Sequence, residues 1–172
     1  MNHPQYILLP ANSFFIVLSL LAAFMLNLFP WGNVVGVPDF VALVLVFWSI
    51  HQPRKVGIGV AFVMGVLMDV HDAVYLGENA LAFTLLSYFA ISIHRRVLWF
   101  PPLVQSFQVF PLFLGVQLIQ LAVRLLLSTD AHFPGWLFFL GCILTTALWP
   151  VATWLLLAPQ RRAVDKDDTR PI

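Results

Sequence analysis

The chain has 172 residues, of which 60% are hydrophobic and 10% charged, with a formal net charge of +1 and a single cysteine. A soluble domain carries about a quarter charged residues, so this chain has too little polar surface to cover itself in water. The composition indicates a membrane protein. It argues against nucleic-acid binding and excludes an internal disulfide or a thiolate zinc cluster.

Six apolar segments approach or exceed the length that crosses the hydrocarbon layer, which takes about 20 residues. They are uniformly apolar rather than alternating, which favours helices over a membrane barrel. The predicted helices cover residues 13–29, 34–50, 56–70, 79–93, 102–127 and 136–158. We expect one all-α membrane domain over residues 1–158, in which the short second and third segments could instead form a re-entrant hairpin. The charged tail, residues 159–172, is expected to be disordered.

The basic residues predict the orientation. Eight of the nine Lys and Arg residues lie after the second segment, after the fourth segment or in the tail: Arg54, Lys55, Arg95, Arg96, Arg161, Arg162, Lys166 and Arg170. The loops after the first, third and fifth segments contain none. Because basic residues concentrate on the cytoplasmic side, this pattern predicts six spans with both termini in the cytoplasm. The candidates for contact with anionic lipid are Arg54, Lys55, Arg95, Arg96, Arg161 and Arg162.

Small residues recur along one face of the third segment. Gly57, Ala61 and Gly65 are spaced by four, and Asp69 continues the same face. Small residues let a second helix approach closely, and such packing drives helix association in lipid. The face therefore predicts either packing within this chain or a docking surface for another membrane protein.

Three ionisable residues fall within or at the edge of the apolar segments at similar predicted depth: Asp39, which follows Pro38, Asp69 and Arg124. A hydrogen-bonded cluster of Arg124 with Asp69 or Asp39 would offset the cost of removing each charge from water. Alternatively, Asp39 caps its helix and Arg124 extends to the lipid headgroups.

Polar residues also follow one face of the fifth segment, where Gln117, Gln120 and Arg124 align. A polar stripe in a membrane helix must face protein or water, so it predicts a hydrogen-bonded seam between helices, a cavity lining or a contact with a partner helix.

Catalysis has little support in the sequence. The five histidines lie outside the apolar segments or at their edges, on both sides of the membrane, and no hydrolase, nucleotide-binding or zinc-protease motif occurs. Cys142 is expected to be a small core residue. We therefore predict a protein that is not an enzyme and uses no cofactor or metal.

Five stretches together resemble the MreD family of rod-shape-determining membrane proteins of Gram-negative bacteria. They are residues 38–39, 53–55, 56–69 with its glycines and aspartate, 76–77 and 148–150. The resemblance covers nearly the whole chain, from the first segment to residue 150.

The resemblance implies a non-enzymatic inner-membrane subunit of the cell-wall elongation complex, required for rod shape and lateral peptidoglycan synthesis. It implies binding to MreC, with MreB, RodA and its class B transpeptidase as further partners. A fold similar to the substrate-binding component of energy-coupling-factor transporters is also implied. The expected partner-binding residues are Pro38, Asp39, Gly57, Gly65, Asp69 and Arg124. The competing hypothesis is a substrate-binding component of a small-molecule transporter, with the stripe of Gln117, Gln120 and Arg124 lining the ligand pocket.

Overall fold

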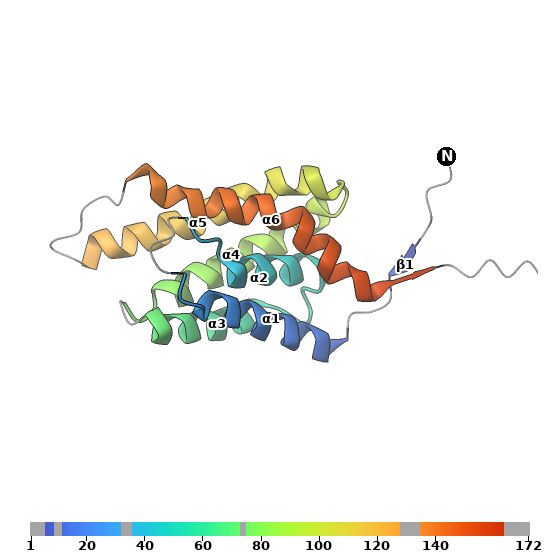
Figure 1. Cartoon of the computed structure of the whole chain (residues 1–172), viewed down its shortest axis with the longest axis horizontal. Coiled ribbons are helices and arrows are strands. Elements are labelled where there is room, and N and C mark those ends of the chain that lie inside the picture. The colour runs from blue at the N-terminus through green and yellow to red at the C-terminus, as the bar shows by residue number, and fades with distance from the viewer. Residues whose placement is uncertain (1–5, 9–11, 32–35, 73–74, 128–134, 164–172) are drawn as a thin grey trace, which may run out of the picture.

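The computed structural model describes residues 6–8, 12–31, 36–72, 75–127 and 135–163, and within them the fold is helical (Figure 1). The helices are α1 (Ser13–Leu28), α2 (Phe40–His51), α3 (Ile58–Asp72), α4 (Glu78–Val97), α5 (Pro102–Leu127) and α6 (Leu140–Leu157). Two short 3-10 helices, η1 (Trp136–Phe139) and η2 (Ala158–Gln160), flank α6. The described residues confirm the predicted all-α fold with six α-helices.

Two predicted helix boundaries differ clearly from the structure, each for a local reason, and smaller differences occur elsewhere. The second helix begins at Phe40 rather than at residue 34, because Asp39 is its N-cap and accepts a hydrogen bond from the Ala42 N–H at 2.9 Å. The fourth helix continues to Val97 rather than ending at residue 93. Arg95 and Arg96 are good helix formers, and a positive charge is favourable at a helix C-terminus, so these residues prolong the helix.

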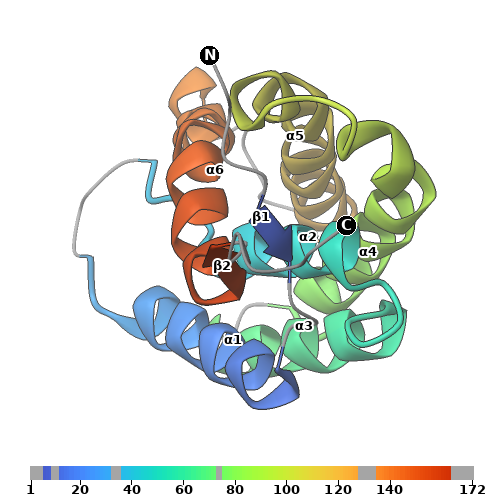
Figure 2. The same cartoon turned by 90° about the vertical axis from the view of Figure 1, so that its right-hand side faces the viewer.

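Helix α2 forms the centre of the bundle, and Figure 2 shows it surrounded by the other helices. Every residue of α2 from Val41 to Ile50 is buried. The largest of these side chains, Phe47 and Trp48, are fully enclosed. A helix that is apolar on all sides is stable only inside other protein or lipid, and here protein surrounds it.

The outward faces of the other helices are strongly apolar. Phe14 of α1, Phe107 of α5 and Trp154 of α6 are 72%, 83% and 63% exposed. Such faces fit hydrocarbon rather than water. Residues 102–127 and 136–160 form two helical stretches long and apolar enough to cross a membrane, whereas α1 and α2 are shorter apolar helices.

The terminal segments meet in a short two-stranded sheet. Strand β1 (Tyr6–Leu8) pairs antiparallel with β2 (Arg161–Ala163), so that Tyr6 faces Ala163 and Leu8 faces Arg161. The expectation of disorder from residue 159 onward is therefore wrong for residues 159–163, because η2 and the strand pairing satisfy their backbone groups. The rest of the tail, residues 164–172 with Lys166 and Arg170, lies outside the described residues.

Candidate functional site: the polar end of the bundle

Asp69, near the end of α3, caps the first turn of the next helix, α4. Its carboxylate accepts hydrogen bonds from the backbone N–H groups of Gly77 at 2.9 Å, Asn79 at 2.7 Å and Ala80 at 3.1 Å. Gly77, the N-cap residue, has φ 102° and no side chain that could cap the helix. Asp69 is 2% exposed. Its buried charge is therefore stabilised by the N–H groups and by the positive end of the helix dipole.

Gly65 permits the close approach of α3 to α4. A Cβ atom at this position would clash with Cα of Ala80 and would lie 2.6 Å from the carbonyl oxygen of Asn79. Ala61, one turn earlier, is fully buried. The small-residue face thus packs within the chain at Ala61 and Gly65, whereas a Cβ at Gly57 would have only the Pro53 carbonyl oxygen nearby, at 3.8 Å.

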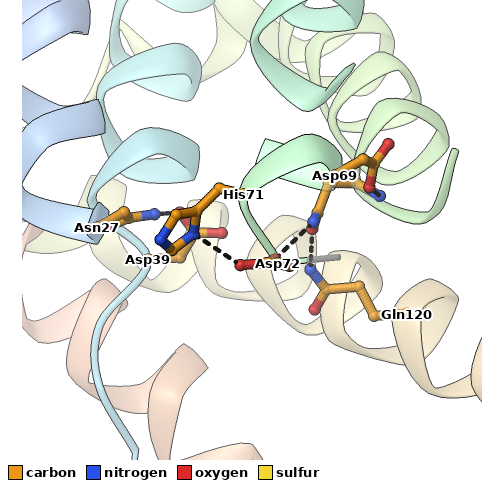
Figure 3. A network of polar contacts seen from close by, with 7 residues as sticks. Asn27, Asp39, Asp69, His71, Asp72 and Gln120 are labelled. Carbon is orange, nitrogen blue, oxygen red and sulfur yellow. Dashed lines mark hydrogen bonds and ion pairs between the residues drawn. The ribbon is translucent and has the colours of Figure 1, made fainter. Parts of the chain in front are cut away.

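Asn79 connects α4 with two other helices. Its Nδ2 donates to Asp72 Oδ2 of α3 at 2.9 Å, and its Oδ1 accepts from Gln120 Nε2 of α5 at 2.8 Å (Figure 3). The other carboxylate oxygen of Asp72 lies 3.1 Å from Nδ1 of His71. Gln120 therefore forms part of an interhelical seam, one of the roles that its position on the stripe predicted.

Arg124 pairs with Glu78. Its Nε donates to Glu78 Oε1 at 2.7 Å, which ties α5 to the first residue of α4. Glu78 is 2% exposed while the Arg124 side chain is 42% exposed, so the pair joins a buried carboxylate to a half-exposed guanidinium. The predicted pairing of Arg124 with Asp69 or Asp39 is wrong. Both aspartates accept backbone N–H groups instead. The predicted helix from residue 79 leaves Glu78 in a loop, whereas the structure makes Glu78 the first residue of α4.

Asp39 organises a second group of contacts at the same end of the bundle. Its Oδ1 accepts from Asn27 Nδ2 of α1 at 3.0 Å, and its backbone N–H donates to Thr145 Oγ1 of α6 at 2.9 Å. The side-chain oxygen of Asn27 accepts from the Phe40 N–H at 3.0 Å. The alternative that Asp39 caps its helix just after Pro38 is confirmed, and the cap also joins three helices.

We call these two groups together the polar end of the bundle. Its residues are Asn27, Asp39, Asp69, Asp72, Glu78, Asn79, Gln120, Arg124 and Thr145. Sequence reasoning missed Asn27, Asp72, Glu78, Asn79 and Thr145. Two features of the sequence could have indicated some of them. Asn27 is a single amide inside an apolar segment, and in residues 76–79 a glycine precedes two polar residues.

Gln117 lines a small cavity beside Asp39, Gln120, Cys142 and Thr145, with a volume of about 40 Å³. Its Oε1 atom is buried and has no hydrogen-bond partner among the described residues. Pockets for small molecules measure about 300–1,000 Å³, so this cavity is too small for a ligand of vitamin size. It has room for only a few water molecules, at about 10–15 Å³ for each.

The basic residues lie at the opposite ends of the helices. Arg54 and Lys55 are exposed in the loop between α2 and α3, and Arg95 and Arg96 are exposed in the last turn of α4. Arg161 and Arg162 belong to β2. We call this the basic end of the bundle. One end thus carries acidic and amide groups, several of them buried, and the other carries the exposed positive charges of Arg54, Lys55, Arg95 and Arg96.

The polar end shows no arrangement for metal binding or nucleophilic catalysis in the part of the chain that the structure describes. No group of three His, Cys, Asp or Glu residues is placed there to hold a metal ion. Cys142 is buried, and its Sγ donates to the Phe139 carbonyl oxygen at 3.2 Å. The carboxylates and amides of the polar end are engaged mainly in holding helices together.

The bundle has apolar outer faces, a hydrogen-bonded polar end and a basic opposite end. These features define a helical integral membrane protein in which the contacts of buried charged groups stabilise the fold. The family model described as rod shape-determining protein MreD matches residues 10–158. A curated relative from Haemophilus influenzae, named rod shape-determining protein MreD, is 31% identical over 158 residues, which cover 88% of this chain and 90% of the relative. The chain belongs to the MreD family. It is therefore assigned to the membrane proteins that determine rod shape.

No solved structure matches the chain. The implied similarity to the substrate-binding component of energy-coupling-factor transporters consequently gains no support from known structures. The small volume of the cavity beside Gln117 also gives no support to the hypothesis of a small-molecule transporter.

Proposed function

We propose that the protein is a non-enzymatic subunit of the cell-wall elongation complex in the bacterial inner membrane, and that it acts by binding MreC. The observation that carries this proposal is the family match over residues 10–158. The helical architecture supports it, because a chain made almost wholly of apolar helices can act on partners only through its membrane faces and short loops. MreB, RodA and the class B transpeptidase are partners in the same assembly.

The orientation that we propose places the basic end in the cytoplasm. This end carries Arg54, Lys55, Arg95 and Arg96. Basic residues concentrate on the cytoplasmic side of membrane proteins. The polar end then faces the periplasm. MreC would contact the chain within the membrane and at that surface.

The N-terminal half of α3 has an open face opposite the packed face of Ala61 and Gly65, because two residues turn a helix by about 200°. A Cβ atom at Gly59, on this open face, would meet nothing within 4 Å. The neighbouring side chains of Phe62 and Val63 are 52% and 56% exposed. We propose that the membrane helix of MreC packs here, because small residues allow two helix backbones to approach closely.

Copurification with tagged MreC tests this proposal. Gly59→Leu places a large side chain on the open face without a clash inside the chain, so we expect it to reduce the recovery of MreC about tenfold while the protein remains folded. Gly115→Leu is the matched control, because a Cβ at Gly115 of α5 would also meet nothing within 4 Å. Unchanged recovery with Gly59→Leu would show that MreC binds elsewhere. Recovery of a transporter ATPase module without MreC would contradict the proposed function itself.

A further inference from the structure

The small cavity beside Gln117 lies between the two hydrogen-bonded groups of the polar end. Asp39 and Thr145 line it from the first group, and Gln120 lines it from the second group. The Asp39 group links α1, α2 and α6, whereas the group around Asn79 links α3, α4 and α5. Among the described residues, no direct hydrogen bond joins the two groups. A ligand in the cavity can therefore contact both of them.

The polar atoms of the lining are mainly acceptors of hydrogen bonds. Gln117 Oε1 is buried and accepts no hydrogen bond from the described residues. Gln120 donates its Nε2 to Asn79, and its side-chain oxygen is left to accept. The Asp39 carboxylate is a further acceptor. A buried acceptor without a donor is costly in free energy, so this lining favours a small ligand that donates hydrogen bonds.

The size of the cavity favours water among such ligands. Its volume is about 40 Å³, and each water molecule needs about 10–15 Å³, so about three molecules fit. Water occupies a cavity where each molecule finds two to four polar partners, whereas apolar cavities stay dry. Four lining residues offer polar partners here: Asp39, Gln117, Gln120 and Thr145.

We propose that the cavity binds a cluster of about three water molecules, which donate hydrogen bonds to Gln117 Oε1 and to the Asp39 carboxylate and connect the two groups. Water-mediated hydrogen bonds are nearly as favourable in enthalpy as direct ones. The network then runs from Asn27 in α1 through Asp39, the water cluster, Gln120 and Asn79 to Asp72 in α3. The polar end becomes one hydrogen-bonded unit that spans all six helices.

X-ray radiolytic footprinting of the full-length protein in detergent tests this proposal. Hydroxyl radicals formed from bound water oxidise the side chains beside it, even where these are buried. Cys142 lines the cavity and is 2% exposed, whereas Met64 is 6% exposed and lies outside the cavity. Both contain an oxidisable sulfur. Each rate is measured by mass spectrometry and divided by the rate for the denatured protein. We expect this ratio to be about tenfold higher for Cys142 than for Met64. Equal ratios would overturn the proposal.

Variants that fill the cavity test the position of the water. Ala42 lines the cavity, so Ala42→Val adds two methyl groups there and should lower the Cys142 ratio at least about fivefold. Val116→Ile adds one methyl group to the same lining and is the milder second variant. Gly59→Ala on α3 is the control and should leave the ratio unchanged. Size-exclusion chromatography identifies the variants that remain folded. An unchanged Cys142 ratio in folded Ala42→Val and Val116→Ile would contradict the site.

A double-mutant cycle tests whether the water connects the two groups. Thr145→Val alters the first group and Gln120→Leu the second, and no hydrogen bond joins the two side chains directly. We expect the combined change in apparent Tm to differ from the sum of the single changes by about 2 °C or more. Additive changes would show that the groups are independent. A higher Tm in sodium chloride than in choline chloride of equal ionic strength would show that an ion occupies the cavity, and would overturn the proposal.

Discussion

Asp69 of α3 accepts a hydrogen bond from the backbone N–H of Asn79 in α4 at 2.7 Å, and the same carboxylate accepts two further N–H groups. A side chain from one helix thus caps the next helix. The cap, the close packing at Gly65 and the ion pair between Glu78 and Arg124 all act on the first turns of α4. Much of the polar end is therefore held together by contacts with the first turns of α4.

Removing the Asp69 carboxylate should destabilise the bundle strongly. Asp69→Ala leaves three buried N–H groups without their acceptor, and we expect a loss of about 3 kcal/mol, or a fall of about 6–12 °C in the apparent Tm. Asp69→Asn retains one oxygen acceptor and should lose less. Thermal unfolding of the purified protein in detergent, followed by size-exclusion chromatography, measures both. An unchanged Tm for Asp69→Ala would show that the cap is unimportant.

Enlarging Gly65 should separate α3 from α4. A Cβ atom at this position clashes with backbone atoms of Ala80 and Asn79, which cannot rotate away as a flexible side chain can. We expect Gly65→Ala to cost about 2 kcal/mol or more and Gly65→Leu to prevent folding. Gly59→Ala is the control on the same helix, where the space is open. Normal yield and Tm for Gly65→Leu would contradict the close approach.

The ion pair between Arg124 and Glu78 should show coupling in a double-mutant cycle. Arg124→Gln leaves the buried Glu78 carboxylate without its partner, and we expect a loss of about 2 kcal/mol because the arginine is half-exposed. Glu78→Gln/Arg124→Gln should recover about half of that loss, because no buried charge remains. Additive effects of the two single substitutions on the apparent Tm would show that the residues do not interact.

Two glutamines three residues apart on α5 should respond in opposite ways. Gln117→Leu removes a buried oxygen that has no partner among the described residues, so stability should be unchanged or higher by about 1 kcal/mol. Gln120→Leu breaks the hydrogen bond to Asn79 Oδ1 and should lower stability by about 1 kcal/mol. Equal destabilisation by both substitutions, measured as apparent Tm, would contradict this assignment.

The sequence predicts the helices well because the hydropathy and the length of each apolar segment can be read along the chain, without knowledge of how the helices pack. The bounds of α5, residues 102–127, agree with the structure, and the spacing of Ala61 and Gly65 identifies a face where helices meet. The partner of Arg124 could not be predicted in this way, because it depends on the residue at which α4 begins. Gly77, the N-cap, has a positive φ, and Glu78 follows it in the first turn beside α5. Hydropathy alone predicts a loop at Glu78.

The long-range contacts of the two capping residues, Asp39 and Asp69, also cannot be predicted from local sequence patterns. The role of Asp39 as a cap is readable from its position before an apolar run, but its contacts with Asn27 and Thr145 join residues 12 and 106 positions away. The three N–H groups held by Asp69 lie 8 to 11 residues further along the chain. Such contacts follow from helix packing rather than from spacing within one segment.

The central claim is that this protein determines rod shape, and complementation of a depleted rod-shaped bacterium tests it most directly. Cells that lose their own MreD-family protein are given this chain, and cell length and width are measured by microscopy. We expect the unaltered chain to restore rods and Asp69→Ala, which weakens the bundle, to restore them poorly. Cells that become round despite normal amounts of the unaltered chain in the membrane would contradict the claim.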